Sequence, residues 1–372
     1  MSEVAVAMPR AHAACVAAVL LAAARVSGSG GGAGSGATPP EVHAAMRWYA
    51  ERGGSLSPAL EVRPSAACGG GLGVFATAPL EPRQVVGSFP LGATVSAACA
   101  LHDAELGPAA RAYLREHAPD GESIVLAAFL AHVRARTRDR PDAASAHAYA
   151  AYVNSLPWGD GHGDVPDSLA AHPLIAPLAA GSAGGARDVQ LAQHVADARE
   201  SAAQVGELLA GIAAPRPDAA ACLRAVALVA SRTFDFSTPL RAAGISLDGD
   251  GGLVHGRCVA VPVFDCLNHP SAAALAAHGD AGRRFQEHTI LDACLRWRMV
   301  PAAGATATAA GGAAAPGAPA SIAVLAPSAL KVRAGDELWM WYGNAGWGEQ
   351  NREAWEAKEV KFLAQYGFVP WE

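Results

Sequence analysis

The chain has 372 residues, which is long enough to bury a hydrophobic core and to form two structural units with tails. Its formal net charge is −6 and 17% of its residues are charged, so nothing in the composition indicates a nucleic-acid-binding surface. The 7 cysteines include no C-x-x-C pair and the 13 histidines no H-E-x-x-H pair, which argues against a metal site and a disulfide scaffold and favours a reducing compartment.

Residues 1–40 form a low-complexity leader with an apolar run over 13–24 and a Gly/Ser-rich tract over 27–36. The run is shorter than the roughly 20 residues that cross a bilayer, so we expect no membrane anchor. Glu3 is the only acid before Glu41, a composition typical of an organelle transit peptide and hence of a chloroplast protein. The alternative is a disordered tail on a cytoplasmic or nuclear protein.

A short helix followed by strands comes next. Val42, Met46 and Tyr49 share one face of a predicted helix over 41–52, which Gly53-Gly54 ends. Strand-forming residues then alternate with turn residues, and Pro79 and Pro82 mark a loop between the later strands. The predicted strands lie within residues 60–62, 69–77 and 85–89.

From about residue 97 to residue 232 the apolar period is helical. Leu126, Phe129, Leu130 and Val133 recur at i, i+3, i+4 and i+7, which predicts one apolar helix face. Helical periods also occur over 187–213 and 218–231, the second with Leu223, Val226, Ala227 and Ala230 facing one way, and the segment Tyr152–Trp158 opens a Gly- and Pro-rich loop that extends to about residue 185. This block is typical of a helical insert in a β framework.

The β pattern resumes at residues 252–254 and continues through an apolar run over 261–267, which ends abruptly at Asn268-His269-Pro270. Further strands are expected within 290–300, 321–325 and 329–332, and a last one leads into Tyr342. Residues 301–320 have no charged side chain and predict a disordered surface loop, whereas residues 351–363 predict a helix.

Two motifs suggest a ligand but are better explained otherwise. The segment 71–76 matches the dinucleotide fingerprint G-x-G-x-x-A, but Pro79 and Pro82 forbid the helix that a pyrophosphate would need. A strand-loop-strand whose glycines let the backbone approach a ligand closely is the alternative. The segment 248–251 resembles the start of a calcium loop, but Val259 stands where the twelfth-position glutamate belongs, so we expect a turn.

Five short motifs occur in an order that resembles the SET-domain protein methyltransferases: Gly71-Leu72-Gly73, Ser231-Arg232, Asp265-x-x-Asn268-His269, Tyr342-Gly343 and Tyr366-Gly367-Phe368. The helical insert is similar to that of the subgroup containing the plant Rubisco large-subunit lysine methyltransferase. The resemblance covers roughly residues 41–372. It implies an α+β fold, namely a β-rich SET fold with knot-like C-terminal threading and an inserted helical subdomain. After the leader, its parts would be the N-terminal SET portion 41–96, the insert 97–230 and the C-terminal SET portion 231–372.

This resemblance implies an S-adenosylmethionine-dependent protein-lysine N-methyltransferase that acts on a non-histone protein. It assigns catalysis to Tyr342 and the substrate pocket to Phe234 and Tyr342. In-line methyl transfer requires chiefly alignment at about 3–3.5 Å and no metal. The cofactor would contact Leu72, Gly73, Arg232, Asp265, Asn268, His269, Tyr342 and Tyr366.

Several alternatives stay open. The apolar ring of Phe234 suits a lysine stem, whereas a histidine acceptor would want a hydrogen-bond partner, so a protein-histidine methyltransferase is the less favoured enzyme. The subgroup carries a C-terminal domain that grips the substrate, whereas this chain ends at Glu372, so a SET-fold binding or regulatory protein with little turnover is the other alternative. We expect a protein partner and neither nucleic acid nor membrane. The sequence does not indicate the oligomeric state, the substrate or the degree of methylation.

Overall fold

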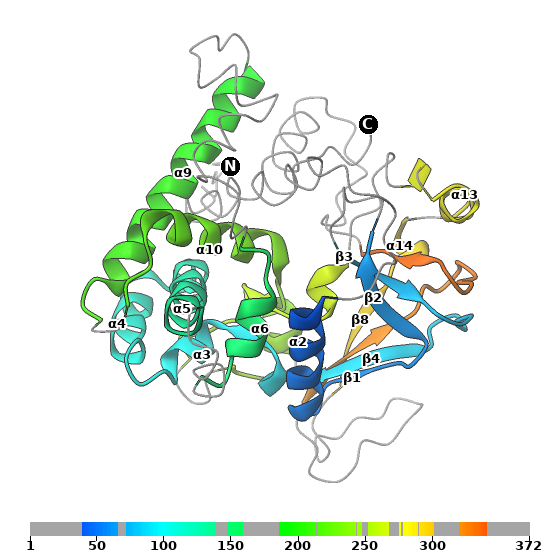
Figure 1. Ribbon diagram of the computed structural model, residues 1–372, viewed down its shortest axis with the longest axis horizontal. Coiled ribbons are helices and arrows are strands. Elements are labelled where there is room, and N and C mark those ends of the chain that lie inside the picture. Colours follow the sequence, from blue (N-terminus) through cyan, green and yellow to red (C-terminus); the bar gives the residue numbers. More distant parts are fainter. Residues whose placement is uncertain are drawn as a thin grey trace, which may run out of the picture.

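The computed structural model describes residues 39–65, 72–138, 147–158, 186–212, 215–242, 244–247, 252–267, 275–276, 278–288, 290–300 and 320–340. Figure 1 shows the helices of residues 97–232 gathered on one side and most of the strands on the other. Every strand pair in these residues is antiparallel. The architecture therefore mixes helix and sheet and keeps the two largely apart.

The helix α2 (Pro40–Glu51) confirms the prediction for residues 41–52. It lies between the strands and the helical side in Figure 1 and packs against the short helix α6 (Ala150–Ser155). Its buried face includes Val42, Trp48 and Tyr49. The helix ends where Gly53 adopts a φ of +81°, a conformation that glycine tolerates without a steric penalty.

Three small sheets join segments that are distant in the sequence. The strand orders are β1-β4-β9-β8, β10-β3-β2 and β5-β7-β6. The predicted strands at 60–62, 69–77, 85–89 and 321–325 are confirmed. In chain order the strands are β1 (Ser55–Leu56), β2 (Leu60–Pro64), β3 (Leu72–Ala76), β4 (Val85–Pro90), β5 (Val95–Ser96), β6 (Thr233–Phe234), β7 (Val259–Ala260), β8 (Arg296–Val300), β9 (Ser321–Leu325) and β10 (Glu337–Leu338).

The predicted helical block is confirmed, but its central helix is more deeply buried than the pattern suggested. The helix α5 (Glu122–Thr137) is buried at every position from Glu122 to Val133, rather than along the single face of Leu126, Phe129, Leu130 and Val133. The reason is that helices pack against it from several sides. Those neighbours are α3 (Ala97–Leu101), α4 (Gly107–His117), α6, α9 (Ala186–Leu209) and α10 (Ala219–Arg232), and α10 also buries more than its predicted face.

Five segments differ from the sequence-based expectation. Residues 329–332 form no strand, and Val332 makes an isolated bridge with Leu80. Tyr152 to Ser155 belong to α6 and not to a loop. Residues 252–254 form no strand; just beyond them the backbone N–H groups of residues 255–257 bond to a side chain instead of a neighbouring strand. The apolar run after β7 turns into the 3₁₀ helix η6 (Phe264–Cys266), because Val263 has a φ of +76°. Residues 290–293 form α14 (Ile290–Ala293), and the strand begins only where β9 offers a pairing partner.

A buried carboxylate, Glu122, and a partly buried one, Asp103, stabilise the helical block. Glu122 accepts hydrogen bonds from the backbone N–H groups of His255, Gly256 and Arg257 at 2.6, 3.1 and 3.0 Å. Asp103 accepts from the backbone N–H groups of residues 105 and 106 at 2.9 and 2.8 Å, and Nε2 of His147 lies 3.3 Å away. Burial alone would raise the pKa of Asp103, but these hydrogen bonds outweigh it and hold the pKa well below the usual range.

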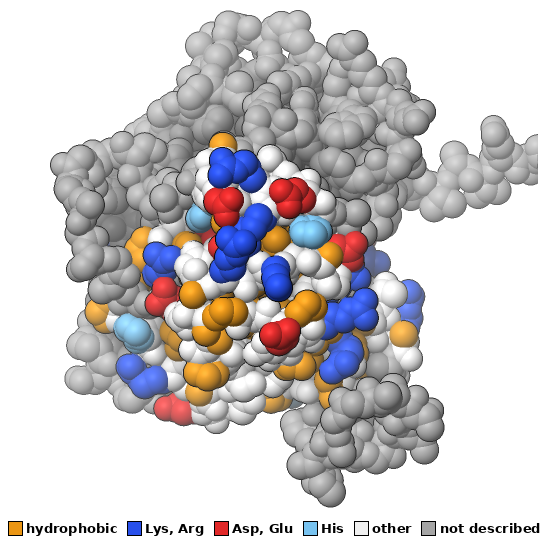
Figure 2. All heavy atoms as spheres, turned by 90° about the vertical axis from the view of Figure 1, so that its right-hand side faces the viewer, with side chains coloured by type: hydrophobic (Ala, Val, Ile, Leu, Met, Phe, Trp, Pro, Cys, Tyr) orange, Lys and Arg blue, Asp and Glu red, His pale blue; other side chains and the backbone are white. Residues whose placement is uncertain are grey.

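The surface on the side of α13 (Asp280–Gln286) carries basic and acidic side chains next to one another (Figure 2). Arg284 contacts Asp336 at 2.7 Å, and Arg333 lies 3.3 Å from Asp280. The remaining short elements are η3 (Leu91–Ala93) and α11 (Ser237–Ala242). Within the described ranges no helix is both long and apolar enough to cross a bilayer, and no set of three histidine, cysteine or acidic side chains could hold a metal.

Several predictions fall outside the described residues. These are the leader up to residue 38, the loop over residues 159–185, the turn at 248–251, the loop at 301–319, the strand end at Tyr342 and the helix at 351–363. The division of the chain into three SET-related parts also stays a prediction.

Candidate functional site

Arg232 and Asp265, both predicted to serve the cofactor, lie in direct contact. Arg232 is the last residue of α10, a position that the helix dipole favours for a cation, and Asp265 lies in η6. The Arg232 Nη1 atom donates to the Asp265 carbonyl oxygen at 3.0 Å and lies 3.7 Å from its Oδ2. The side chain of Asp265 is 3% exposed and that of Arg232 is 22% exposed. The main-chain carbonyl of Asp265 thus holds a guanidinium that reaches the surface, and the buried carboxylate of the same residue lies within ion-pair distance.

A third residue, Tyr152 of α6, completes this cluster and was not identified from the sequence. Its hydroxyl donates to Asp265 Oδ2 at 3.0 Å, while Sγ of Cys266 lies 3.8 Å from Oδ1. Burial raises the pKa of Asp265, and the Arg232 charge and the Tyr152 hydrogen bond act in the opposite direction. Because Tyr152 and Asp265 are 113 positions apart, no local pattern connects them. We call the side chains of Tyr152, Arg232 and Asp265 the Asp265 cluster.

Leu72 and Gly73, the predicted cofactor contacts on the other side of the fold, open β3. A Cβ atom on Gly73 would collide with the Glu337 carboxylate and lie 3.1 Å from the Phe75 ring. The Glu337 side chain is fully buried; it accepts from Ser65 Oγ at 2.8 Å and lies 2.7 Å from His278 Nε2. The structure therefore gives this glycine a packing reason that the motif alone did not reveal.

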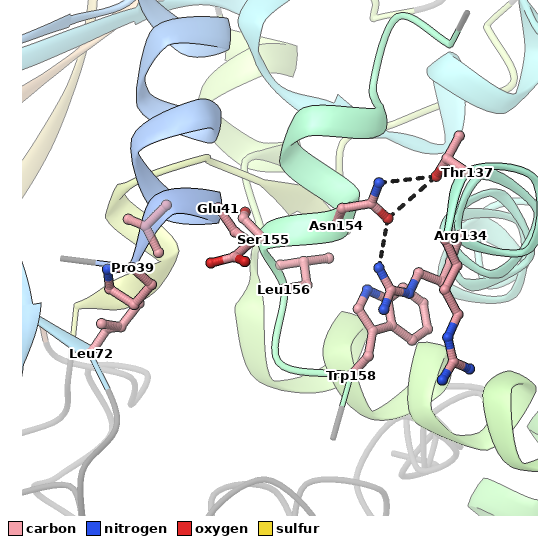
Figure 3. A pocket seen from close by; sticks show the side chains of 11 residues that line it. Pro39, Glu41, Leu72, Arg134, Thr137, Asn154, Ser155, Leu156 and Trp158 are labelled. Atoms are coloured by element: carbon pink, nitrogen blue, oxygen red, sulfur yellow. Dashed lines mark hydrogen bonds between the residues drawn. The ribbon is translucent and has the colours of Figure 1, made fainter. Parts of the chain in front are cut away.

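A cavity of about 510 Å³ lies between α2, the start of β3, the end of α5 and the end of α6. Leu72 and Pro39 lie at one side of it and Arg134 and Trp158 at the other (Figure 3). Asn154 accepts from Arg134 Nη1 at 2.7 Å and bonds to the Thr137 hydroxyl. Since α6 supplies Asn154 to the cavity and Tyr152 to the Asp265 cluster, one short helix connects both features.

Phe234, predicted to face the substrate, is partly exposed at the end of β6. Its ring lies 5.2 Å from Trp297 and 6.1 Å from Phe236, and Trp297 also contacts Phe89 and Phe264. Trp297 was not identified from the sequence, where it was one aromatic in a strand pattern. The aromatic pairing fixes the ring of Phe234 two residues beyond Arg232.

Four predicted site residues, Asn268, His269, Tyr342 and Tyr366, lie outside the described residues. The described chain reaches Leu267 and Met340, both buried, just before two of these positions. Their assignments therefore stay predictions.

No model of a known protein family matches the sequence, and no curated protein matches it. Solved structures do match. The SET domain of LSMT bound to lysine and AdoHcy gives a TM-score of 0.54 at 15% identity over 89% of this chain. Rubisco LSMT bound to sinefungin and monomethyllysine gives 0.51 at 14% identity over 89% of this chain.

The chain has the SET-domain fold. This confirms the fold that the motif order implied, with its mixture of helices and sheets. At 14–15% identity the likeness concerns the fold, and this chain spans 57% of the length of each SET-domain neighbour. Knot-like threading and a separate inserted subdomain stay predictions for this chain.

Proposed function

We propose that this protein is an S-adenosylmethionine-dependent protein-lysine N-methyltransferase that acts on a non-histone protein. The observation that carries the proposal is the contact between Arg232 and Asp265 in a chain with the SET-domain fold. The two neighbours described above were solved with lysine or monomethyllysine together with AdoHcy or sinefungin. The same chemistry is assigned to this chain as a proposal.

The described residues fit such a cofactor. The partly exposed guanidinium of Arg232 suits the carboxylate of an amino-acid moiety, and Asp265 keeps that guanidinium in place. The cavity beside Leu72 has the volume and the mixed polar and apolar lining of a small-molecule site. Asn268, His269 and Tyr366 would complete the contacts. S-adenosylmethionine, when bound, supplies a methyl group on a sulfonium.

The acceptor side requires a neutral amine. A lysine has a pKa of about 10.4 in water, and a desolvated channel lined by apolar rings lowers that pKa. Phe234, packed on Trp297, would line the lysine stem, and no separate base is needed once the amine is desolvated. Tyr342, on the segment that would complete the knot-like crossing, would accept weak C–H···O contacts from the methyl group and align it for in-line attack.

The proposal is tested by methyl transfer from labelled S-adenosylmethionine to fractionated protein extract, followed by identification of the modified residue by mass spectrometry. We expect label on lysine. Label on histidine would favour the histidine methyltransferase, and cofactor binding without transfer would favour a binding or regulatory protein. A protein that does not bind the cofactor contradicts all three.

The variant Tyr342→Phe is expected to lose about 100-fold or more of the transfer rate, because the hydroxyl acts on the transferred methyl group. Its affinity for S-adenosylhomocysteine should change less than about twofold, because most cofactor contacts lie elsewhere. The control Tyr49→Phe removes a buried hydroxyl that donates to the Ser88 carbonyl and belongs to no residue assigned to the cofactor or the substrate. Equal rates for the parent and Tyr342→Phe would exclude the assigned role.

A further inference from the structure

Tyr152 is a buried residue whose phenol hydroxyl donates a hydrogen bond to the Asp265 carboxylate. It belongs to α6 in the helical block, whereas Asp265 and Arg232 belong to η6 and to the end of α10. We infer that Tyr152 is a positioning residue for Arg232: it fixes the Asp265 carboxylate, which in turn holds the guanidinium for the cofactor. This inference rests on the proposed function and adds to it a contribution from the helical block.

The contacts of Asp265 support this order of action. Among the described side chains, the Tyr152 hydroxyl makes the shortest contact to the carboxylate, at 3.0 Å, compared with 3.7 Å for Arg232 Nη1 and 3.8 Å for Cys266 Sγ. A buried carboxylate is costly unless donors satisfy it. Of these three contacts, two involve Oδ2, and loss of the phenol hydroxyl would leave Oδ2 with the more distant contact to the guanidinium. The carboxylate would then be free to turn toward other donors, so that Arg232 would lose its ionic contact and be held by the Asp265 carbonyl oxygen without it.

The Tyr152 ring is itself held in place. Trp48 of α2 stacks on it with ring centres 5.9 Å apart and an interplanar angle of 22°. The same two helices line the 510 Å³ cavity, through Val42 of α2 and Asn154 of α6. The Tyr152 ring, which does not line the cavity, therefore links the cavity-lining helices to Arg232 through packed groups.

The charges around Asp265 give the inference a readout that simple loss of stability would not produce. The facing groups are Arg232 from α10, Tyr152 from α6 and Cys266 from the same turn. Burial raises the pKa of Cys266 to about 12 and that of Tyr152 well above its usual value, so both are neutral near pH 7. Arg232 stays charged. Asp265 is thus the acidic member of this group, and burial raises its pKa.

Removing the Tyr152 hydroxyl takes away a hydrogen bond that lowers the pKa of Asp265. In Tyr152→Phe the carboxylate should therefore become protonated at a higher pH than in the parent. A protonated Asp265 no longer neutralises the positive charge of Arg232 and no longer orients the guanidinium. Cofactor affinity should then decline with falling pH, and the decline should start at a higher pH in the variant.

The test is calorimetric titration of the full chain with S-adenosylhomocysteine between pH 5.5 and pH 8.5. Tyr152→Phe should raise Kd roughly tenfold at pH 8, as expected for loss of one hydrogen bond to a charged group, and shift the pH profile upward. The control Tyr49→Phe also removes one hydroxyl from a side chain that is 2% exposed, and it should change Kd less than about twofold.

The outcomes separate the inference from the proposed function. If the parent does not bind S-adenosylhomocysteine, the proposed function fails and the inference fails with it. If the parent binds and the Kd and pH profile of Tyr152→Phe coincide with those of Tyr49→Phe, the inference alone is overturned. Should Tyr152→Phe not fold, Asp265→Asn tests the same connection. It retains an oxygen acceptor for Tyr152 but no titrating charge, so we expect weaker binding with a flat pH profile, and parent-like binding overturns the inference.

Discussion

Replacing Gly73 with alanine should destabilise the protein although it adds a single methyl group. The added carbon would meet the Glu337 carboxylate, whose carboxyl carbon would be 2.9 Å away, and would lie 3.1 Å from the ring of Phe75. The carboxylate is the end of a flexible side chain, but here it cannot turn away without cost. It is fully buried, accepts from Ser65 Oγ at 2.8 Å and lies 2.7 Å from His278 Nε2.

The size of the effect follows from these contacts. Displacing the carboxylate weakens at least one hydrogen bond to a charged buried group, which is worth about 1.5–3 kcal/mol. Overpacking of a tight interior site adds about 1–3 kcal/mol, and part of that strain is the same displacement. We therefore expect Gly73→Ala to lower the free energy of unfolding by about 2–4 kcal/mol.

Urea denaturation of four proteins measures this effect: the parent, Gly73→Ala, Glu337→Ala and the double variant. In the Glu337→Ala background, Gly73→Ala should change the free energy of unfolding by close to zero. Alanine is more favourable than glycine in a strand by roughly 0.5–1 kcal/mol, and this offsets the tight contact with the Phe75 ring. Gly92→Ala is the matched control, since nothing lies within 4 Å of its added carbon. An equal cost of Gly73→Ala in both backgrounds would refute the role given to Glu337.

Two further predictions concern the carboxylates of Glu122 and Asp103 in the helical block. Glu122→Ala should lower the free energy of unfolding by about 3 kcal/mol or more, because it leaves the backbone N–H groups of residues 255–257 without their acceptor. Glu122→Gln should lower it less. The control Glu116→Ala changes a side chain that is 78% exposed and should stay within about 0.5 kcal/mol of the parent. Asp103 has a lowered pKa when folded, so its charge stabilises the fold above the unfolded pKa of about 3.9, and this contribution is lost as pH falls. The cost of Asp103→Asn should accordingly shrink between pH 7 and pH 3 in urea titrations, and a cost that does not change with pH would contradict the assignment.

The elements that the sequence predicted well are those whose burial has one clear period. The helix α2 buries one face against α6 and is followed by glycines, so its apolar periodicity and its C-terminal end could both be predicted from the sequence. The strands β2, β3 and β4 alternate with glycine and proline turns and were found for the same reason. α5 was found as a helix, but its burial on all sides depends on neighbours that a single face cannot indicate.

The elements that the sequence predicted poorly are those in which tertiary contacts override local preference. The apolar, β-branched run before Asp265 has a strand composition, yet Val263 at a φ of +76° turns it into a 3₁₀ helix. Residues 255–257 could have continued a strand, but the Glu122 carboxylate bonds to their N–H groups. In the second case the deciding contact comes from a residue at least 133 positions away, and a window of neighbouring residues does not contain it.

The candidate site shows the same division between what a motif encodes and what packing adds. The resemblance assigned both Arg232 and Asp265 to the cofactor, and the structure brings the two residues into contact. Their supporting groups come from far along the chain: Tyr152 is 113 positions from Asp265, and Ser65 is 272 positions from Glu337. Because a buried charge must find a donor, the existence of such a partner follows from chemistry once the charge is known to be buried. Its identity depends on which helix the fold lays against the site. For Asp265 that helix belongs to the helical block, so the proposed function implies that changes in this block alter cofactor affinity as well as the stability of the fold.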